Sequence, residues 1–199
     1  TSFAQRLKLQ LMVNGLSPVS LSIDDYFVNR DKTPLDEYGE KDYESIYAID
    51  LENFNQDLEK LILGYEVNIP RFNFVTGERE YIKDKNISIN ENQPIIIEGI
   101  HALNPILTDS IPDGNKFKIY ISALTQLNLD EHNKIPTTDL RLIRRTVRDY
   151  HHRSYSASQT LSMWQSVNRG ERKNIFPYQE NADIMFNSSL AYEISVLKP

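Results

Sequence analysis

VSLSIDD, residues 19–25, places an apolar side chain at every second position and then ends in two carboxylates, Asp24 and Asp25. This alternation predicts a β-strand. A second run, PIIIEG at residues 94–99, is typical of a buried parallel strand and ends in Glu98. Ligands of open α/β sheets bind at the carboxyl ends of the strands. Both strands are therefore predicted to end in a carboxylate where a site is expected.

The other elements follow from the same periodicity. We expect helices over residues 1–14, 49–63, 137–153 and 156–167, and strands over residues 66–69, 72–74, 81–89, 117–121 and 182–186. Thr76-Gly77 predicts the turn of a small hairpin. Strands that alternate with helices predict an α/β fold, with a mostly parallel sheet and helices on both faces.

Composition excludes several classes of protein. The 199 residues are 40% hydrophobic, which suits one domain with a real core. A net charge of −6 disfavours a general nucleic-acid binder, because such binding needs a cationic surface. The absence of cysteine excludes disulfides and thiolate metal sites, so we expect a cytoplasmic protein. No apolar run approaches the roughly 20 residues of a membrane span, and residues 1–16 lack the pattern of a secretory signal.

Asp24 is the strongest catalytic candidate. A carboxylate after a strand can accept a hydroxyl proton or help to hold Mg²⁺. Position alone leaves open that Asp24 is a turn or helix-cap residue, and Asp25 fits a cap better. Glu98, followed by Gly99, could reach a metal or its water shell, and the alternative is an acid stabilised at a helix start.

Five arginines lie on or just after one predicted helix, with Asp139 and Asp149 as counter-charges: Arg141, Arg144, Arg145, Arg148 and Arg153. Guanidinium groups at this density can bind polyphosphate oxygens. A solvated helix face and an RNA-binding surface are the alternatives. The four histidines show no metal-type spacing, and we interpret them as structural or surface residues. Tyr26, Phe27 and Phe72 either stack on a base or belong to the core.

Taken in chain order, these segments resemble the uridine kinase and phosphoribulokinase family of P-loop kinases over nearly the whole chain. By this resemblance Asp24 activates the acceptor hydroxyl, in residues 21–27. Residues 43–50 and 69–74 are similar to the family's acceptor-binding stretches. The resemblance implies that Glu44 binds the ribose hydroxyls, that Phe72 faces the base, and that Tyr26 and Phe27 also contact the acceptor. Residues 95–99 imply Glu98 near Mg²⁺. Residues 139–153 resemble the lid helix, which implies phosphate contacts by Arg145 on the acceptor side and by Arg148 and Arg153 on ATP.

The chain departs from the family pattern in two places. No Gly-x-x-x-x-Gly-Lys-[Ser/Thr] loop, which cradles the phosphates, occurs in the 199 residues. Residues 1–4 resemble the start of the helix after that loop. Thr1 is then the closing hydroxyl of the motif, a ligand of Mg²⁺ and ATP, and we expect a single kinase domain whose first strand and loop lie upstream. Gly77, Tyr155 and Met163 stand where the family has a base-reading histidine, a lid arginine and a glutamine, which leaves the acceptor open.

The chain further resembles bacterial uridine-kinase-like proteins that have threonyl-tRNA-synthetase-related domains ahead of the kinase. This likeness rests on residues 25–30 with Thr33-Pro34, and on the segment from residues 175–178 to residues 187–189. The expected function is ATP- and Mg²⁺-dependent phosphoryl transfer to a small acceptor, a nucleoside first. A phosphoribulokinase-like sugar-phosphate kinase, a non-catalytic ATP-binding regulatory module and an RNA-binding module are the alternatives. No nucleic-acid or membrane partner is expected, and a homo-oligomer stays open.

Overall fold

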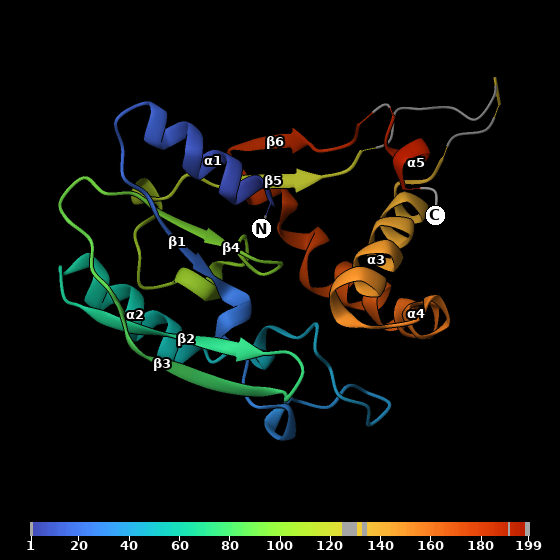
Figure 1. Ribbon diagram of the computed structural model, residues 1–199, viewed down its shortest axis with the longest axis horizontal. Coiled ribbons are helices and arrows are strands. Elements are labelled where there is room, and N and C mark those ends of the chain that lie inside the picture. The colour runs from blue at the N-terminus through green and yellow to red at the C-terminus, as the bar shows by residue number, and fades with distance from the viewer. Residues whose placement is uncertain (1, 125–130, 133–134, 191, 198–199) are drawn as a thin grey trace. The chain divides into compact units, whose positions relative to one another are not determined.

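The structure is a computed structural model that describes residues 2–124, 131–132, 135–190 and 192–197. The chain divides into two compact units, Thr1–Asp113 and Gly114–Pro199. The first unit contains helices α1 (Ser2–Val13) and α2 (Leu51–Ile62) with strands β1 to β4, and the second contains strands β5 and β6 with helices α3 to α5 (Figure 1).

A pair of parallel strands forms the centre of the first unit. Strand β1 (Val19–Ser22) pairs with β4 (Ile95–Glu98), and the register sets Val19 opposite Ile95 and Ser22 opposite Glu98. A single 3-10 turn, η1 (Ile23–Tyr26), follows β1 directly. Because parallel strands end at the same edge, this register brings Ser22, Glu98 and the start of η1 to one edge of the pair.

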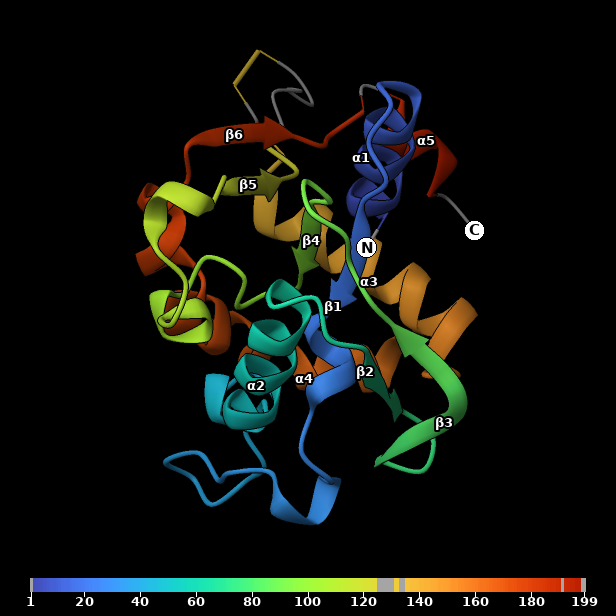
Figure 2. The ribbon, with the colours of Figure 1, turned by 90° about the vertical axis from the view of Figure 1, so that its left-hand side faces the viewer.

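Helix α2 supplies much of the core of the first unit. Asp50 caps its first turn by accepting a hydrogen bond from the backbone N–H of Asn53, at 3.1 Å. Phe54, Leu58 and Leu61 follow helical spacing and are buried against the core residues of β1 and η1. In Figure 2, α2 and the β2–β3 hairpin are seen on either side of the segment after β1. The predicted helix over residues 49–63 is confirmed.

The hairpin consists of β2 (Val67–Asn73) and β3 (Glu78–Ile87), which pair antiparallel. The sequence predicted two short strands here, over residues 66–69 and 72–74, whereas β2 is continuous. Its register shifts between Asn68 and Pro70. Proline has no N–H to donate to the ladder, so an irregularity at this point lets the strand continue.

In the second unit, β5 (Ile119–Ser122) and β6 (Ile184–Asn187) form another parallel pair. Helix α3 (Thr137–Arg153) has the predicted bounds, and a short α5 (Glu193–Val196) follows β6. Helix α4 (Ala157–Asn174) begins at a Ser156–Gln159 capping box and continues well beyond the predicted end at residue 167. Glu171 is buried and pairs with Arg141 of α3, and this ion pair stabilises the last turns of α4.

The observed elements confirm the α/β class and its parallel strand pairs. In the part of the chain that the structure describes, no helix is both long and apolar enough to span a membrane.

Candidate active site

The carboxyl edge of β1 and β4 carries the site's best-defined hydrogen bond. The Ser22 hydroxyl donates to Oε1 of Glu98 at 2.7 Å. Gly99, which follows Glu98, has φ +151°, and a Cβ atom there would lie 2.9 Å from Cβ of Ile23. Only glycine permits this approach of the two strand ends. Backbone geometry therefore holds the Glu98 carboxylate at this edge.

Asp24 and Asp25 lie in η1, directly after β1, and both are half-buried. Oδ1 of Asp25 accepts a hydrogen bond from the backbone N–H of Phe72 at 3.3 Å. The expectation that Asp25 caps a helix is wrong, because Asp25 lies inside the turn and its carboxylate connects η1 to the hairpin. Asp24 is thus presented at the strand edge on a turn fixed by its neighbour.

Tyr26 lies in the core of the first unit. Its exposed fraction is 0%, its ring contacts Phe54 edge to face at 5.0 Å, and its hydroxyl donates to Oδ2 of Asp57 at 3.2 Å. Burial raises the pKa of the Tyr26 phenol, and burial also raises the pKa of Asp57 against the opposing effect of this hydrogen bond. In this conformation the ring has no surface for the acceptor contact that the resemblance implies. Tyr26 instead joins η1 to α2.

Three phenylalanine rings form an aromatic cluster where η1 meets the hairpin. The ring centroids are 5.5 Å apart for Phe27 and Phe72, 5.1 Å for Phe72 and Phe74, and 6.2 Å for Phe27 and Phe74. Phe27 and Phe72 are half-buried, and Phe74 is 45% exposed. The structure therefore brings together Phe27 and Phe72, two of the three aromatic residues predicted at the acceptor.

Arg30 is fixed on the turn of the hairpin by two hydrogen bonds. Its backbone N–H donates to the Gly77 carbonyl at 2.9 Å, and its Nη2 donates to the Phe74 carbonyl at 2.9 Å. Gly77 has φ +77°, and a Cβ atom there would lie 2.7 Å from Nε of Arg30. The guanidinium thus occupies the space of a side chain at position 77. From the sequence we could predict that Gly77 replaces the family's histidine, but not that Arg30 fills the space beside Gly77.

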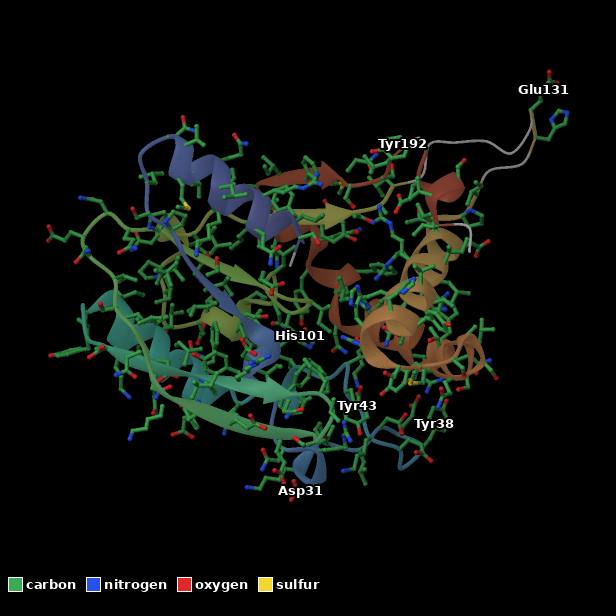
Figure 3. The ribbon with its side chains drawn as sticks, viewed as in Figure 1. Asp31, Tyr38, Tyr43, His101, Glu131 and Tyr192 are labelled. Carbon is green, nitrogen blue, oxygen red and sulfur yellow. The ribbon has the colours of Figure 1, made fainter. Side chains whose placement is uncertain are left out.

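Glu44 and His101 lie around the loop that includes residues 42–45. Glu44 is half-buried, and its backbone N–H donates to Oδ1 of Asp42 at 3.1 Å. His101 is 1% exposed, and Figure 3 shows it inside the ribbon, whereas Asp31 and Tyr38 lie at the edge of the first unit. Burial lowers the pKa of His101 to about 4, against the Asp42 charge and the Ser45 backbone, which raise it. His101 is therefore neutral at pH 7, in agreement with a structural role.

In the second unit, two of the five predicted arginines connect α3 to other elements. Arg141 forms an ion pair with the buried Glu171 of α4, and Arg144 pairs with Glu193 of α5 and donates to the Ser188 carbonyl at 2.9 Å. Burial raises the pKa of Glu171, and the charge of Arg141 opposes that shift. These two arginines stabilise the packing of α3.

The other three arginines share one carboxylate. Asp149 is fully buried, and its oxygens lie 3.4 Å from Nε of Arg145, 2.9 Å from Nη2 of Arg148 and 3.7 Å from Nη1 of Arg153. We call Arg145, Arg148 and Arg153 the arginine cluster. These are the residues that the family resemblance places on phosphates. The sequence identified Asp149 only as a local counter-charge, because nothing in the local pattern marks it as buried.

Predicted site residues thus lie in both units. Asp24, Glu98, Phe27, Phe72 and Glu44 belong to the first unit and the arginine cluster to the second. Thr1, predicted as a ligand of Mg²⁺ and ATP, lies outside the described residues. Among the residues that the structure describes, no group of three or more His, Cys, Asp or Glu side chains could hold a metal ion.

Solved structures share this fold. The chain is similar to a possible uridine kinase from Bacillus stearothermophilus, with a TM-score of 0.55 and 17% identity over 94% of this chain and 80% of that one. It is also similar to a candidate fructose transport system kinase from Silicibacter sp. TM1040, with a TM-score of 0.63 and 19% identity over 93% and 82% of the two chains. The fold is that of the P-loop kinases.

The model of the phosphoribulokinase / uridine kinase family matches residues 1–195, and the chain belongs to this family. It is 26% identical over 196 residues to a uridine kinase of Macrococcus caseolyticus strain JCSC5402, covering 96% of this chain and 86% of that protein. It is also 26% identical over 186 residues to a uridine kinase of Staphylococcus aureus strain JH9, covering 92% and 80%. The family resemblance seen in the sequence is confirmed.

Proposed function

We propose that this protein transfers the γ-phosphoryl group of ATP to the hydroxyl of a small acceptor, with a nucleoside as the first candidate. The observation that carries the proposal is the carboxyl edge of the parallel strands, where Asp24 follows β1 and Glu98 ends β4. The names of the relatives support a nucleoside, since both are uridine kinases. The rings of Phe27 and Phe72 support it as well, because an aromatic face suits a base.

Asp24 accepts the proton of the acceptor hydroxyl in this mechanism. Phosphoryl transfer depends mainly on positioning and on neutralising charge, so a carboxylate that orients one hydroxyl contributes strongly to kcat. Asp25 and Tyr26 hold the turn that carries Asp24, through the backbone of Phe72 and through Asp57. Glu44 orients the acceptor from its loop beside Asp42.

The residues at this edge fit a magnesium ion. Mg²⁺ prefers oxygen ligands and commonly takes only one or two protein carboxylates, with water and phosphate oxygens completing the shell. Glu98, bonded to Ser22, supplies such a carboxylate. In our proposal Glu98 and Thr1 hold Mg²⁺, which neutralises phosphate charge when it is bound. Arg148 and Arg153 bind ATP, and Arg145 binds phosphate on the acceptor side.

A phosphorylated sugar is the second candidate acceptor, because of Arg30. Its guanidinium is fixed over Gly77, and no ion pair of Arg30 with a carboxylate is found among the described residues. A fixed cation beside the aromatic cluster favours an anionic group on the substrate. A nucleoside kinase and a sugar-phosphate kinase would therefore differ in how strongly activity depends on Arg30.

The likeness of residues 25–30 and 175–178 supports the further proposal that the protein belongs with the uridine-kinase-like proteins that carry threonyl-tRNA-synthetase-related domains. The phosphate-binding loop expected before Thr1 and a cytoplasmic location likewise stay predictions. An RNA-binding role for α3 is less favoured, because the chain has a net charge of −6 and general nucleic-acid binding needs a cationic surface.

The test is a screen for ADP release by the full-length protein with ATP and Mg²⁺, offering nucleosides, sugar phosphates and small alcohols in turn. Acceptor-dependent ADP release by the wild type supports the kinase and names its substrate class. Tight ATP binding with no turnover on any acceptor would instead support the regulatory module.

A further inference from the structure

We propose that Asp149 is a positioning residue, which orients the guanidinium groups of the arginine cluster for binding polyphosphate. The inference rests on the proposed function, in which the cluster contacts phosphates. It goes beyond that function because it assigns a role to a carboxylate that contacts no substrate atom.

The helix geometry explains why one carboxylate reaches three arginines. Arg145 and Arg153 are the residues four positions before and after Asp149, so all three lie on one face of α3. Arg148 approaches from the neighbouring position, and its Nε and Nη2 both donate to Oδ1 of Asp149, at 3.0 and 2.9 Å.

The carboxylate and the arginines that it binds differ in their exposure to solvent. The Asp149 side chain is 0% exposed, whereas the side chains of Arg145, Arg148 and Arg153 are 21%, 48% and 32% exposed. Phosphate oxygens can approach the partly exposed guanidinium side chains, while the carboxylate itself stays out of reach.

The electrostatics favour this arrangement over three separate arginines. Three like charges held this close repel one another, and one buried carboxylate offsets a single charge, which leaves a net charge of about +2 for an anionic ligand. Ordering each long side chain beforehand also lowers the entropy lost when the ligand binds. Asp149 should therefore strengthen nucleotide binding, even though it repels phosphate at longer range.

The backbone of Asp149 has a second role, which a substitution can leave intact. Its carbonyl accepts hydrogen bonds from the N–H groups of Ser154 and Tyr155, and Ser154 has φ +56° in the left-handed region. These bonds end α3 directly after Arg153. Asp149→Asn keeps these backbone bonds, while it removes the charge and replaces one acceptor oxygen with an NH₂ group, so the variant tests the carboxylate apart from the helix end.

The decisive experiment is isothermal titration of full-length Asp149→Asn with ATP and, separately, with tripolyphosphate as a probe that has no nucleoside. We expect about 10-fold weaker binding of both ligands, which corresponds to about 1.4 kcal/mol. Asp139→Asn, an exposed acid in the first turn of the same helix, should change neither. Glu171→Gln removes a buried carboxylate bound by Arg141, and should lower stability without changing ATP affinity.

Unchanged ATP affinity in Asp149→Asn would overturn the proposal, as would tighter binding, which would make the carboxylate a competitor of phosphate. If the wild type itself binds no ATP, the proposed function fails first. A second test does not depend on the fold of Asp149→Asn. Because Arg145 and Arg153 share one carboxylate, the losses of affinity in Arg145→Gln and Arg153→Gln should not add in the double variant. Strict additivity would contradict the proposal.

Discussion

The carboxyl edge of β1 and β4 and the arginine helix α3 position their charged groups by different means. At the strand edge, backbone geometry is decisive: a parallel register, a glycine with positive φ and a 3-10 turn place Asp24 and Glu98. On α3, side-chain ion pairs with carboxylates are decisive, above all the buried Asp149. The strand edge therefore depends on the strand pattern and on the backbone conformation that follows each strand. The arrangement on α3 depends on which charged side chains are buried.

The largest expected effect is on chemistry at the strand edge. Asp24→Asn should lower kcat about 1,000-fold, because a positioned base typically contributes 10²- to 10⁴-fold. ATP affinity should stay within about 2-fold, since the arginine cluster is unchanged. Steady-state kinetics with calorimetric ATP binding measures both. Asp25→Asn is the matched control, because it makes the same change of charge next to Asp24 while its amide oxygen can still accept the hydrogen bond from Phe72. Near-normal turnover of Asp24→Asn would remove Asp24 from the mechanism.

A methyl group at Gly99 should break the backbone geometry of that edge. The new Cβ would lie 2.9 Å from Cβ of Ile23, at φ +151°. We expect Gly99→Ala to lower the free energy of unfolding by about 2–4 kcal/mol. Gly64→Ala is the control, since its φ is +81° but nothing lies within 4 Å of the new Cβ. It should cost only about 1 kcal/mol. Urea titrations measure the free energy of unfolding of both variants. Equal losses in the two would show that the close approach at Gly99 does not contribute to stability.

Acid should weaken the first unit through His101. Its pKa is lowered to about 4 in the native state, from 6.5. Between these values the unfolded chain binds a proton that the native state does not, so this contribution to stability is complete above pH 6.5 and is lost as the pH falls toward 4. The total change is about 3 kcal/mol.

Urea titrations at several pH values measure this loss, and His101→Gln should flatten the profile over that window. His151→Gln alters an exposed histidine of α3 and should leave the slope as in the wild type. A wild-type profile that is already flat from pH 6.5 to 4 would contradict the burial-induced shift.

The smallest expected effect is at the hairpin turn, where Arg30 and Gly77 share one space. Gly77→Ala should displace the guanidinium and raise the acceptor KM about 3- to 10-fold, and Arg30→Gln should do the same. The double variant should lose no more than either single variant, with ATP KM unchanged. Independent, multiplying effects would show that the two residues do not act together.

The comparison also explains what could be predicted from the sequence. The apolar patterns and the acids that follow them were enough to predict β1 and β4 and to place Asp24 and Glu98 at the strand ends. These features could be predicted because the period and the direction of a strand are local properties of the sequence. The full lengths of β2 and α4 were not predicted, because they depend on a register shift near Pro70 and on an ion pair between two helices, which the local sequence pattern does not contain. Asp149 could not be recognised, because burial of a charge depends on partners that fold against it. The same holds for Arg30, whose partner Gly77 is remote in sequence.

The most direct test of the central claim follows the phosphoryl group itself. Phosphorus NMR of the full-length protein with ATP, Mg²⁺ and the acceptor found by the screen should show a phosphomonoester on the acceptor hydroxyl, formed in equal amount to ADP. Under the same conditions Asp24→Asn should form almost none. Inorganic phosphate as the only product, or an equal yield of phosphomonoester from Asp24→Asn, would contradict acceptor activation at this strand edge.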